Sequence, residues 1–288
     1  MLYSKGILSN PNSIEFDLHK IEEERPISVQ LIGSNIESLK ESIEILESYK
    51  FDVLDINAGC PSKRAIKSLQ GGYLLTNFEK LEDLLIKAVK YSSKPVSLKT
   101  RIGFTQHLDL EIFRKIINDS GIEFLTIHAR KVKDRLNGLA LDLHFLKKLK
   151  EAIFIPLIGN GDITNPKFAK EFIECTKVDA LMIGRGSIGN PEIFYQIHRY
   201  LSEEKEIHAK NDLNLMSYYI KIYENLIDDF LEGIKIYYPQ EEFKFIEMKR
   251  NSIWLTKFMV EATDLRRKLS VTKNLSQLNG VLQNIFDS

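Results

Sequence analysis

Short β-rich runs alternate with helical stretches along the first two thirds of this 288-residue chain, and this alternation constrains the fold more than any other feature. The six runs occupy residues 27–32, 53–57, 96–101, 124–128, 155–159 and 180–184. Between them, apolar and charged residues mix at helical spacing over residues 36–49, 78–91, 108–120, 141–150 and 166–176. Because parallel strands need a long crossover connection, usually a helix, this order predicts a parallel α/β fold.

Polar or flexible residues stand at the C-terminal end of nearly every predicted strand. They are Gln30, Asn57, Cys60, Lys99, Arg101, His128, Arg130, Asn160, Gly161, Asp162, Gly184 and Arg185. A (β/α) barrel builds its active site from the loops at this end of every strand, whereas a doubly wound sheet concentrates ligands at one switch point. The pattern therefore predicts a TIM-type barrel. Such a barrel has eight strands, so two strand–helix units are expected to be missing, and none is visible before residue 27.

The chain after Pro191 carries no further strand pattern. From residue 203 onward its pattern is helical, with candidate helices at 216–232, 241–262 and 275–286. We therefore predict a barrel domain over residues 1–200 and a small all-α domain over residues 203–288. Between residues 248 and 274 basic residues outnumber acidic ones. The acidic residues are Glu261 and Asp264, and the basic residues are Lys249, Arg250, Lys257, Arg266, Arg267, Lys268 and Lys273. This segment suits a phosphate backbone, and a solvated helix face is an equally simple interpretation.

Composition narrows the class of protein further. The 40 basic and 40 acidic residues cancel, so net charge neither supports nor excludes a nucleic-acid partner. A run of about 18 apolar residues and a secretory signal are both lacking in the sequence, which predicts a cytoplasmic location. The two cysteines, Cys60 and Cys175, form no C-x-x-C motif, so neither a disulfide framework nor a metal site is predicted.

Cys60 is the strongest candidate for a reacting group. The segment from Asp55 to Pro61 ends a predicted strand and turns through Gly and Pro, which would put the thiol at the barrel mouth. A thiol there can transfer a proton or attack as a nucleophile. A cysteine is otherwise more often a small buried hydrophobe, and we interpret Cys175 in that way. The neighbouring Lys63, Arg64 and Lys67 favour the functional interpretation of Cys60.

Four further strand ends suggest a ligand site, and three of them have a plainer alternative. The loop Gly184-Arg185-Gly186 follows the last predicted strand, where barrels commonly hold a phosphate, and Arg185 would clamp it. Asn160-Gly161-Asp162 can contact the same ligand through its backbone, or be simple turn chemistry. Lys99 can face negative charge in the barrel or extend to its rim. His128 can hydrogen-bond a ring or phosphate, or be structural.

With these residues in hand, the sequence resembles the tRNA-dihydrouridine synthase family along nearly its whole length. The most specific stretch is residues 55–68, DINAGCPSKRAIKS. Five further stretches agree in the same order: residues 29–31, 98–103, 126–130, 158–163 and 182–186. The helical tail resembles the tRNA-gripping domain of the family, with residues 247–250 and Trp254 in the expected neighbourhood.

The resemblance implies a flavin enzyme that acts on tRNA. It assigns Gln30, Lys99 and His128 to the isoalloxazine of FMN, and Asn160, Gly161, Asp162, Gly184 and Arg185 to its ribityl chain and phosphate. It implies NADPH as the reductant, hydride delivery to C6 of a uridine taken out of its stack, and a proton from Cys60 to C5. It further suggests Asn57 and Arg130 for the uracil, and Arg135 for the RNA backbone.

The beginning of the chain departs from the family pattern. Family members carry two further strand–helix units, and residues 1–6 resemble the stretch just after the second strand, so we expect the natural protein to be longer. Two rivals remain. One is an FMN barrel enzyme acting on a free pyrimidine, which would not need the basic tail. The other is a non-catalytic RNA-binding remnant that has lost the flavin, which the presence of Cys60, Lys99, His128 and Arg185 disfavours.

Overall fold

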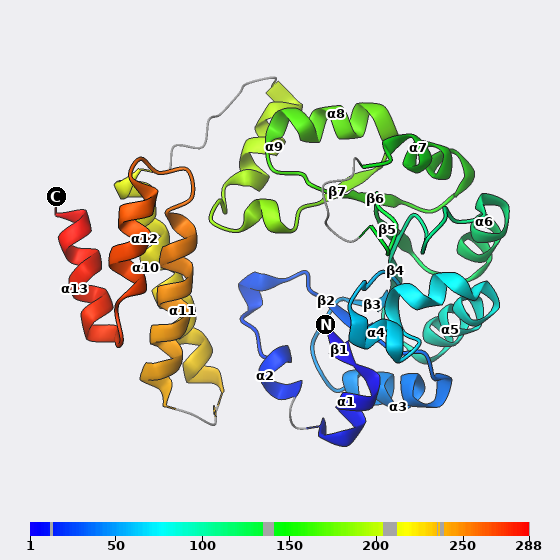
Figure 1. Ribbon diagram of the computed structural model, residues 1–288. Coiled ribbons are helices and arrows are strands. Elements are labelled where there is room, and N and C mark those ends of the chain that lie inside the picture. The colour runs from blue at the N-terminus through cyan, green and yellow to red at the C-terminus, as the bar shows by residue number, and fades with distance from the viewer. Residues whose placement is uncertain (12–13, 135–140, 204–211, 235, 237–238, 288) are drawn as a thin grey trace. The chain divides into compact units, whose positions relative to one another are not determined.

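The computed structural model describes residues 1–11, 14–134, 141–203, 212–234, 236 and 239–287. They form two compact units (Figure 1). The first contains Met1–Leu18, Glu22–Ile163 and Phe168–Ile183, and the second contains His19–Ile21, Thr164–Lys167 and Gly184–Ser288. Each unit has a hydrophobic core of its own.

A parallel sheet of seven strands forms the centre of the first unit. The strands are β1 (Leu2–Tyr3), β2 (Ser28–Ile32), β3 (Val53–Asn57), β4 (Val96–Arg101), β5 (Phe124–His128), β6 (Leu157–Asn160) and β7 (Ala180–Met182). Neighbours in the sheet are also neighbours in the sequence, from β1 to β7. A doubly wound sheet reverses its strand order at a switch point, whereas a barrel does not. The predicted barrel-type α/β fold is therefore confirmed.

The expectation that no strand precedes residue 27 was wrong. Leu2 and Tyr3 form β1, which pairs with Leu31 and Ile32 of β2, and a helix follows it at once. The strand is 2 residues long, too short to show the alternation of apolar and polar residues by which strands are predicted. Long-range pairing with β2, rather than local pattern, defines it.

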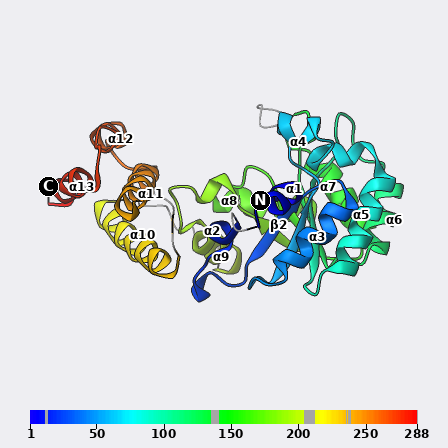
Figure 2. The same cartoon turned by 90° about the horizontal axis from the view of Figure 1, so that it is seen from below.

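Helices follow the strands and lie outside the curved sheet, as Figures 1 and 2 show for α3, α5, α6 and α7. The helices are α1 (Ser4–Ser9), α2 (Ile14–Leu18), α3 (Ile36–Leu46), α4 (Lys63–Lys67), α5 (Phe78–Tyr91), α6 (Leu110–Asp119), α7 (Leu143–Ala152) and α8 (Pro166–Thr176). Short 3₁₀ turns occupy Glu22–Glu24 (η2) and Gly71–Thr76 (η3). Side chains of Asn35, Asn77, Asp109 and Asp142 cap four of these helices at their start.

The second unit is helical. It contains η4 (Arg185–Ser187), α9 (Ile193–Glu203), α10 (Leu213–Gly233), α11 (Gln240–Leu255), α12 (Ala262–Ser270) and α13 (Leu275–Phe286). Leucine, isoleucine, methionine and phenylalanine side chains of α10 to α13 form its core, with Leu269 and Leu278 fully buried. Within the described residues, helices long and apolar enough to cross a membrane are absent.

One predicted helix of this unit ends earlier than expected. The helix expected over residues 241–262 ends at Leu255, and α12 begins at Ala262. Phe258 and Glu261 adopt left-handed backbone conformations between them, with φ of 68° and 59°. Glycine or asparagine usually announces such a break, and neither stands here, so the break could not be predicted from composition.

The left-handed conformation of Glu261 leads to a stability prediction. A side chain costs about 1 kcal/mol in this region, and glycine avoids that cost. We expect Glu261→Gly to raise the free energy of unfolding by about 0.5 kcal/mol or more, measured by urea denaturation. The matched control is Glu242→Gly, at an exposed position inside α11. That change should lower the free energy of unfolding by about 1 kcal/mol, and equal effects at both positions would contradict the account.

Candidate active site

The register of the sheet gathers polar side chains on one face. Residues paired in register share a face, and so do residues two apart on one strand. Three rows result: Gln30, Asp55 and Ser97; Asn57, Lys99 and Thr126; and Arg101, His128 and Asn160. The structure thus brings five predicted site residues together with Arg101, which the sequence placed at a strand end without a ligand role, and adds Asp55, Ser97 and Thr126 to them. Each of these three lies two residues before a predicted site residue, which was the signal in the sequence that could have identified them.

Cys60 lies in a tightly held loop after β3. The Oδ1 atom of Asn57 accepts hydrogen bonds from the backbone N–H groups of Gly59 at 3.1 Å and Cys60 at 2.9 Å. On the other side, the N–H of Gly72 donates to the carbonyl of Cys60 at 3.1 Å. Gly71 has a φ of 59°, and a Cβ there would lie 2.9 Å from the Cβ of Cys60. The loop therefore requires glycine beside the half-buried thiol.

The thiol of Cys60 contacts a helix cap. Its Sγ lies 3.4 Å from the Oγ of Ser62, which accepts from the N–H of Ala65 at the start of α4. The thiol is thus held at the C-terminal end of β3, where a barrel enzyme places its reacting groups. Cys175 lies on α8 and is exposed, so its interpretation as a small buried hydrophobe was wrong.

Asp55 is a buried acidic residue beneath this loop. It is 6% exposed and accepts hydrogen bonds from Gln30 Nε2 at 2.6 Å and Ser97 Oγ at 2.7 Å. Burial raises the pKa of its carboxyl above the usual value, while the hydrogen bonds from Gln30 and Ser97 and the charge of Lys99 oppose that shift. The oxygen of Gln30 in turn accepts from Asn57 Nδ2 at 2.8 Å.

Two cations from β4 lie within electrostatic range of the thiol. Burial lowers the pKa of Lys99, and the negative charges of Asp55 and of the Cys60 thiolate oppose the shift. Arg101 is 7% exposed and donates from Nε to the carbonyl of Gly59 at 3.0 Å and from Nη1 to that of Lys131 at 3.2 Å. Both cations are close enough to interact electrostatically with a thiolate at Cys60.

His128 is buried among these cations. Its pKa is lowered to about 3, first by burial and then by the positive charges of Arg101, Lys99 and Arg130. The imidazole is therefore neutral near pH 7. Within the described residues, its Nδ1 atom is buried without a hydrogen-bond partner. A neutral ring with an unused nitrogen, next to two cations, fits a polar ring ligand such as a flavin.

The pKa of His128 leads to a prediction on pH and stability. Its folded value of about 3 lies below the reference of 6.5, so its contribution to stability is complete above pH 6.5 and is lost as the pH falls toward 3. Between pH 7 and pH 5, we expect the wild-type chain to lose about 2 kcal/mol more unfolding free energy than His128→Asn. Urea denaturation of both proteins at the two pH values measures this difference. Parallel losses would show that His128 protonates in the folded protein.

The segment after β6 forms a turn that anchors an arginine. Gly161 and Asp162 have φ of 142° and 47°, and Asp162 Oδ2 accepts from Nη2 of the buried Arg130 at 2.5 Å. Asn160 Nδ2 donates to the carbonyl of Met182 on β7 at 2.8 Å. The predicted turn therefore also has a structural use, because it fixes Arg130 and ties β6 to β7.

Two predicted residues lie in the second unit. Gly184 and Arg185 are exposed and begin the main segment of the second unit. Among described atoms, none lies within 4 Å of a Cβ built on Gly184, so its backbone is open to an approaching group. Arg135 lies outside the described residues.

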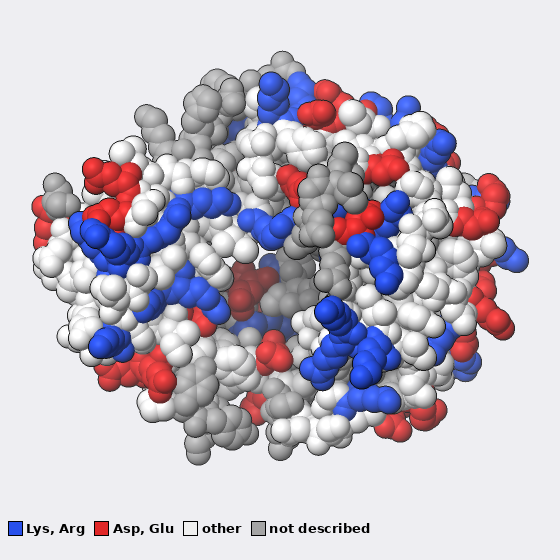
Figure 3. Space-filling view, in the orientation of Figure 1, with Lys and Arg blue, Asp and Glu red and all other residues white. Residues whose placement is uncertain are grey.

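The basic segment of the second unit has partners within that unit. Lys249 Nζ donates to the carbonyls of Ser270 and Thr272 at 2.7 and 2.6 Å, and Lys257 Nζ donates to that of Ile188 at 3.1 Å. Arg250 lies over the ring of Trp254, 5.1 Å from its centroid, and both side chains are partly exposed. Figure 3 shows Lys and Arg side chains gathered over the helices of this unit. Some of these cations therefore stabilise the helices, while others face solvent.

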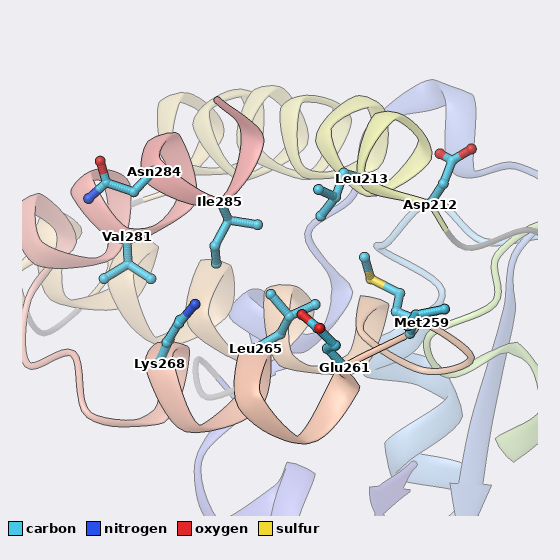
Figure 4. Close-up of a pocket in the computed structure, with 10 residues that line it drawn as sticks. Asp212, Leu213, Met259, Glu261, Leu265, Lys268, Val281, Asn284 and Ile285 are labelled. Carbon is cyan, nitrogen blue, oxygen red and sulfur yellow. The ribbon is translucent and has the colours of Figure 1, made fainter. Parts of the chain in front are cut away.

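A pocket of about 580 Å³ opens between the helices of the second unit. In Figure 4, Leu213, Met259, Leu265 and Ile285 face a common space, while Asn284 points away from it. Its lining is mostly apolar and includes none of the predicted site residues. The chemistry is therefore to be sought at the strand ends of the first unit.

A parallel barrel-type sheet with a thiol, cations and a neutral histidine at its strand ends defines a barrel enzyme. The whole chain, residues 1–288, matches the family described as Dihydrouridine synthase (Dus). The chain belongs to this family, and it is therefore an oxidoreductase of a flavoprotein family.

Individual relatives carry a related name. The chain is 29% identical over 294 residues to "tRNA-dihydrouridine synthase B" of Pectobacterium carotovorum, covering 100% of this chain and 88% of that protein. It is 35% identical over 204 residues to the protein of that name from Escherichia coli strain K12, covering 69% of this chain and 63% of that protein. A solved structure, the 6-hydroxypseudooxynicotine amine oxidase of Pseudomonas geniculata N1, is similar at 13% identity and a TM-score of 0.44, covering 58% of this chain and 28% of that one.

Proposed function

We propose that this chain reduces uridine in tRNA to 5,6-dihydrouridine, with FMN bound at the barrel mouth and NADPH as the reductant. Membership of the dihydrouridine synthase family and the name shared by its relatives support the reaction. The observation that carries the assignment to particular residues is the half-buried Cys60 thiol, held beside Lys99 and Arg101 at the end of β3.

The residues at the strand ends fit FMN. When bound, FMN supplies the hydride that is added to C6 of the uracil ring. Gln30, Lys99 and the neutral His128 would contact its ring, because together they offer an amide, a cation and an unused ring nitrogen. Asn160, Gly161 and Asp162 would contact the ribityl chain, and Gly184 with Arg185 would bind the phosphate, for which an open glycine backbone and an exposed guanidinium are suitable.

Cys60 would donate the proton. Its S–H bond breaks as a C–H bond forms at C5, and the thiolate that remains lies near the positive charges of Lys99 and Arg101. Water then restores the thiol. Asn57 and Arg130 would hold the uracil, and Arg135 would contact the RNA backbone. Because the base must leave its stack to reach this site, an exposed uridine is the suitable substrate.

The helical residues 203–288 would bind the tRNA, and residues 1–200 would form the catalytic domain. The exposed Arg250 on Trp254 supports this, because an aromatic ring with a cation can both stack on a base and neutralise a phosphate.

Two measurements test this proposal against its rivals. The absorption spectrum of the purified chain during FMN titration reports flavin binding, and NADPH oxidation is then followed with tRNA, uracil or orotate as the second substrate. We expect a bound-flavin spectrum and oxidation that depends on tRNA. Oxidation with a free pyrimidine alone would favour the free-pyrimidine reductase, and a folded chain that binds tRNA but no FMN would favour the RNA-binding remnant.

A further inference from the structure

A continuous chain of side-chain amides links the buried carboxylate of Asp55 to the backbone of the Cys60 loop. Gln30 Nε2 donates to Asp55 at 2.6 Å, and Asn57 Nδ2 donates to Gln30 Oε1 at 2.8 Å. The remaining oxygen of Asn57 accepts from the N–H groups of Gly59 and Cys60, at 3.1 and 2.9 Å. These hydrogen bonds cross three segments of the fold, from β2 through β3 to the loop after it.

The direction of this chain is fixed by the chemistry of its two ends. An ionised carboxylate can only accept hydrogen bonds, and a backbone N–H can only donate. Gln30 and Asn57 lie between them, and each has one amide orientation that satisfies both neighbours. Oxygen and nitrogen of such amides are distinguished by their hydrogen-bond network, and here the two ends leave no alternative.

We infer that Asp55 is a positioning residue, which holds Cys60 in place by fixing the amide orientations of Gln30 and Asn57. Its catalytic consequence depends on the proposed role of Cys60 as proton donor, whereas the geometry itself does not. Asp55 is suited to this task because it is 6% exposed and has a second donor, Ser97 Oγ at 2.7 Å. Both carboxylate oxygens are therefore occupied as acceptors.

The substitution Asp55→Val removes the carboxylate and fills its place with an apolar side chain that strands accept. Gln30 Nε2 then has no acceptor at position 55, so the amide of Gln30 is no longer held in one orientation. When this amide turns, Asn57 Nδ2 loses its acceptor, and the oxygen of Asn57 is no longer fixed toward the N–H groups of Gly59 and Cys60.

The conservative substitution Asp55→Asn keeps the direction of the chain. The hydroxyl of Ser97 can accept as well as donate, so the new NH₂ group can donate to Ser97 while the new oxygen accepts from Gln30 Nε2. Asp55→Asn therefore removes the charge of Asp55 and keeps the acceptor that orients Gln30.

The matched control is Ser97→Ala. It removes the other hydrogen bond of the same carboxylate, at 2.7 Å, and leaves the chain through Gln30 and Asn57 intact. A general loosening of the buried site would therefore affect this control and Asp55→Val alike, whereas loss of the chain affects only Asp55→Val.

The test measures the loop directly. In a Cys175→Ser background Cys60 is the sole thiol, so its rate of alkylation reports its accessibility. Hydrogen exchange of the Gly59 and Cys60 amides reports the lost acceptor. We expect Asp55→Val to accelerate both by about tenfold, and Asp55→Asn and Ser97→Ala to remain within about threefold of the parent. Unchanged rates in Asp55→Val, or an Asp55→Asn variant that is no slower than it, would overturn the inference.

A folding defect in Asp55→Val does not leave the inference untested. If Asp55→Val fails to fold, a parent-like loop in Asp55→Asn supports the inference, and a loosened loop in that variant overturns it. The two loop measurements need neither FMN nor tRNA, so they stand even if the proposed function fails. Where dihydrouridine formation is measured as well, we expect Asp55→Val to lower kcat by about tenfold or more with little change in the KM for tRNA.

Discussion

Replacing Cys60 by alanine should lower the rate of dihydrouridine formation by about a hundredfold or more, because a positioned general acid contributes about 10² to 10⁴ to a rate. The thiol is the proton donor in the proposed reaction and lies half-buried in a loop fixed by Asn57 and Gly72. Alanine removes one sulfur atom and leaves these backbone hydrogen bonds in place. FMN affinity, measured by titration, should therefore remain within about twofold of the wild type.

The control is Cys175→Ala, which changes the exposed cysteine of α8. It should form dihydrouridine at the wild-type rate. A Cys60→Ala protein as active as this control would remove Cys60 from the mechanism, and it would leave the family assignment and the fold untouched.

Arg101→Met should be the most damaging change to the stability of the site. The buried guanidinium donates to the carbonyls of Gly59 and Lys131 and joins the Cys60 loop to the segment after β5. Charge-assisted hydrogen bonds contribute about 1.5 to 3 kcal/mol each, and the carbonyls left behind are poorly solvated. We expect the free energy of unfolding to fall by about 3 kcal/mol, and dihydrouridine formation to fall by about tenfold, measured by urea denaturation and nucleoside analysis.

Arg101→Lys separates charge from geometry. Lysine keeps the positive charge near the thiolate but lacks the planar fork that reaches both carbonyls. We expect it to lose about half as much unfolding free energy as Arg101→Met and to retain more activity. A methionine variant as stable as the wild type would contradict the bridging role of Arg101.

Much of the fold could be predicted because local pattern and long-range structure agree. Strands 53–57, 96–101 and 124–128 and helices 78–91, 166–176 and 275–286 have the bounds expected from the sequence. Two features were predicted wrongly because local pattern and long-range structure disagree there. β1 exists through its pairing with β2, and α11 ends through left-handed residues that carry no glycine signal. Tertiary contacts decide both features, and local propensity does not report them.

The candidate site was predictable in outline because barrel strands deliver their last residues to one rim. This logic identified Gln30, Asn57, Lys99, His128 and Asn160, which the register places on one face. It placed Arg101 at a strand end without a ligand role and did not identify Asp55 or Ser97, because a sequence shows which residues end a strand and not which hydrogen bonds join them. The roles of all these residues toward FMN and uracil remain predictions.

The most direct test of the account is nucleoside mass spectrometry of tRNA that lacks dihydrouridine, after incubation with the purified chain, FMN and NADPH. Dihydrouridine should appear with the wild-type chain and with Cys175→Ala, and omission of NADPH should abolish its formation. A folded, flavin-bound chain that leaves every uridine of the tRNA unchanged would contradict the account.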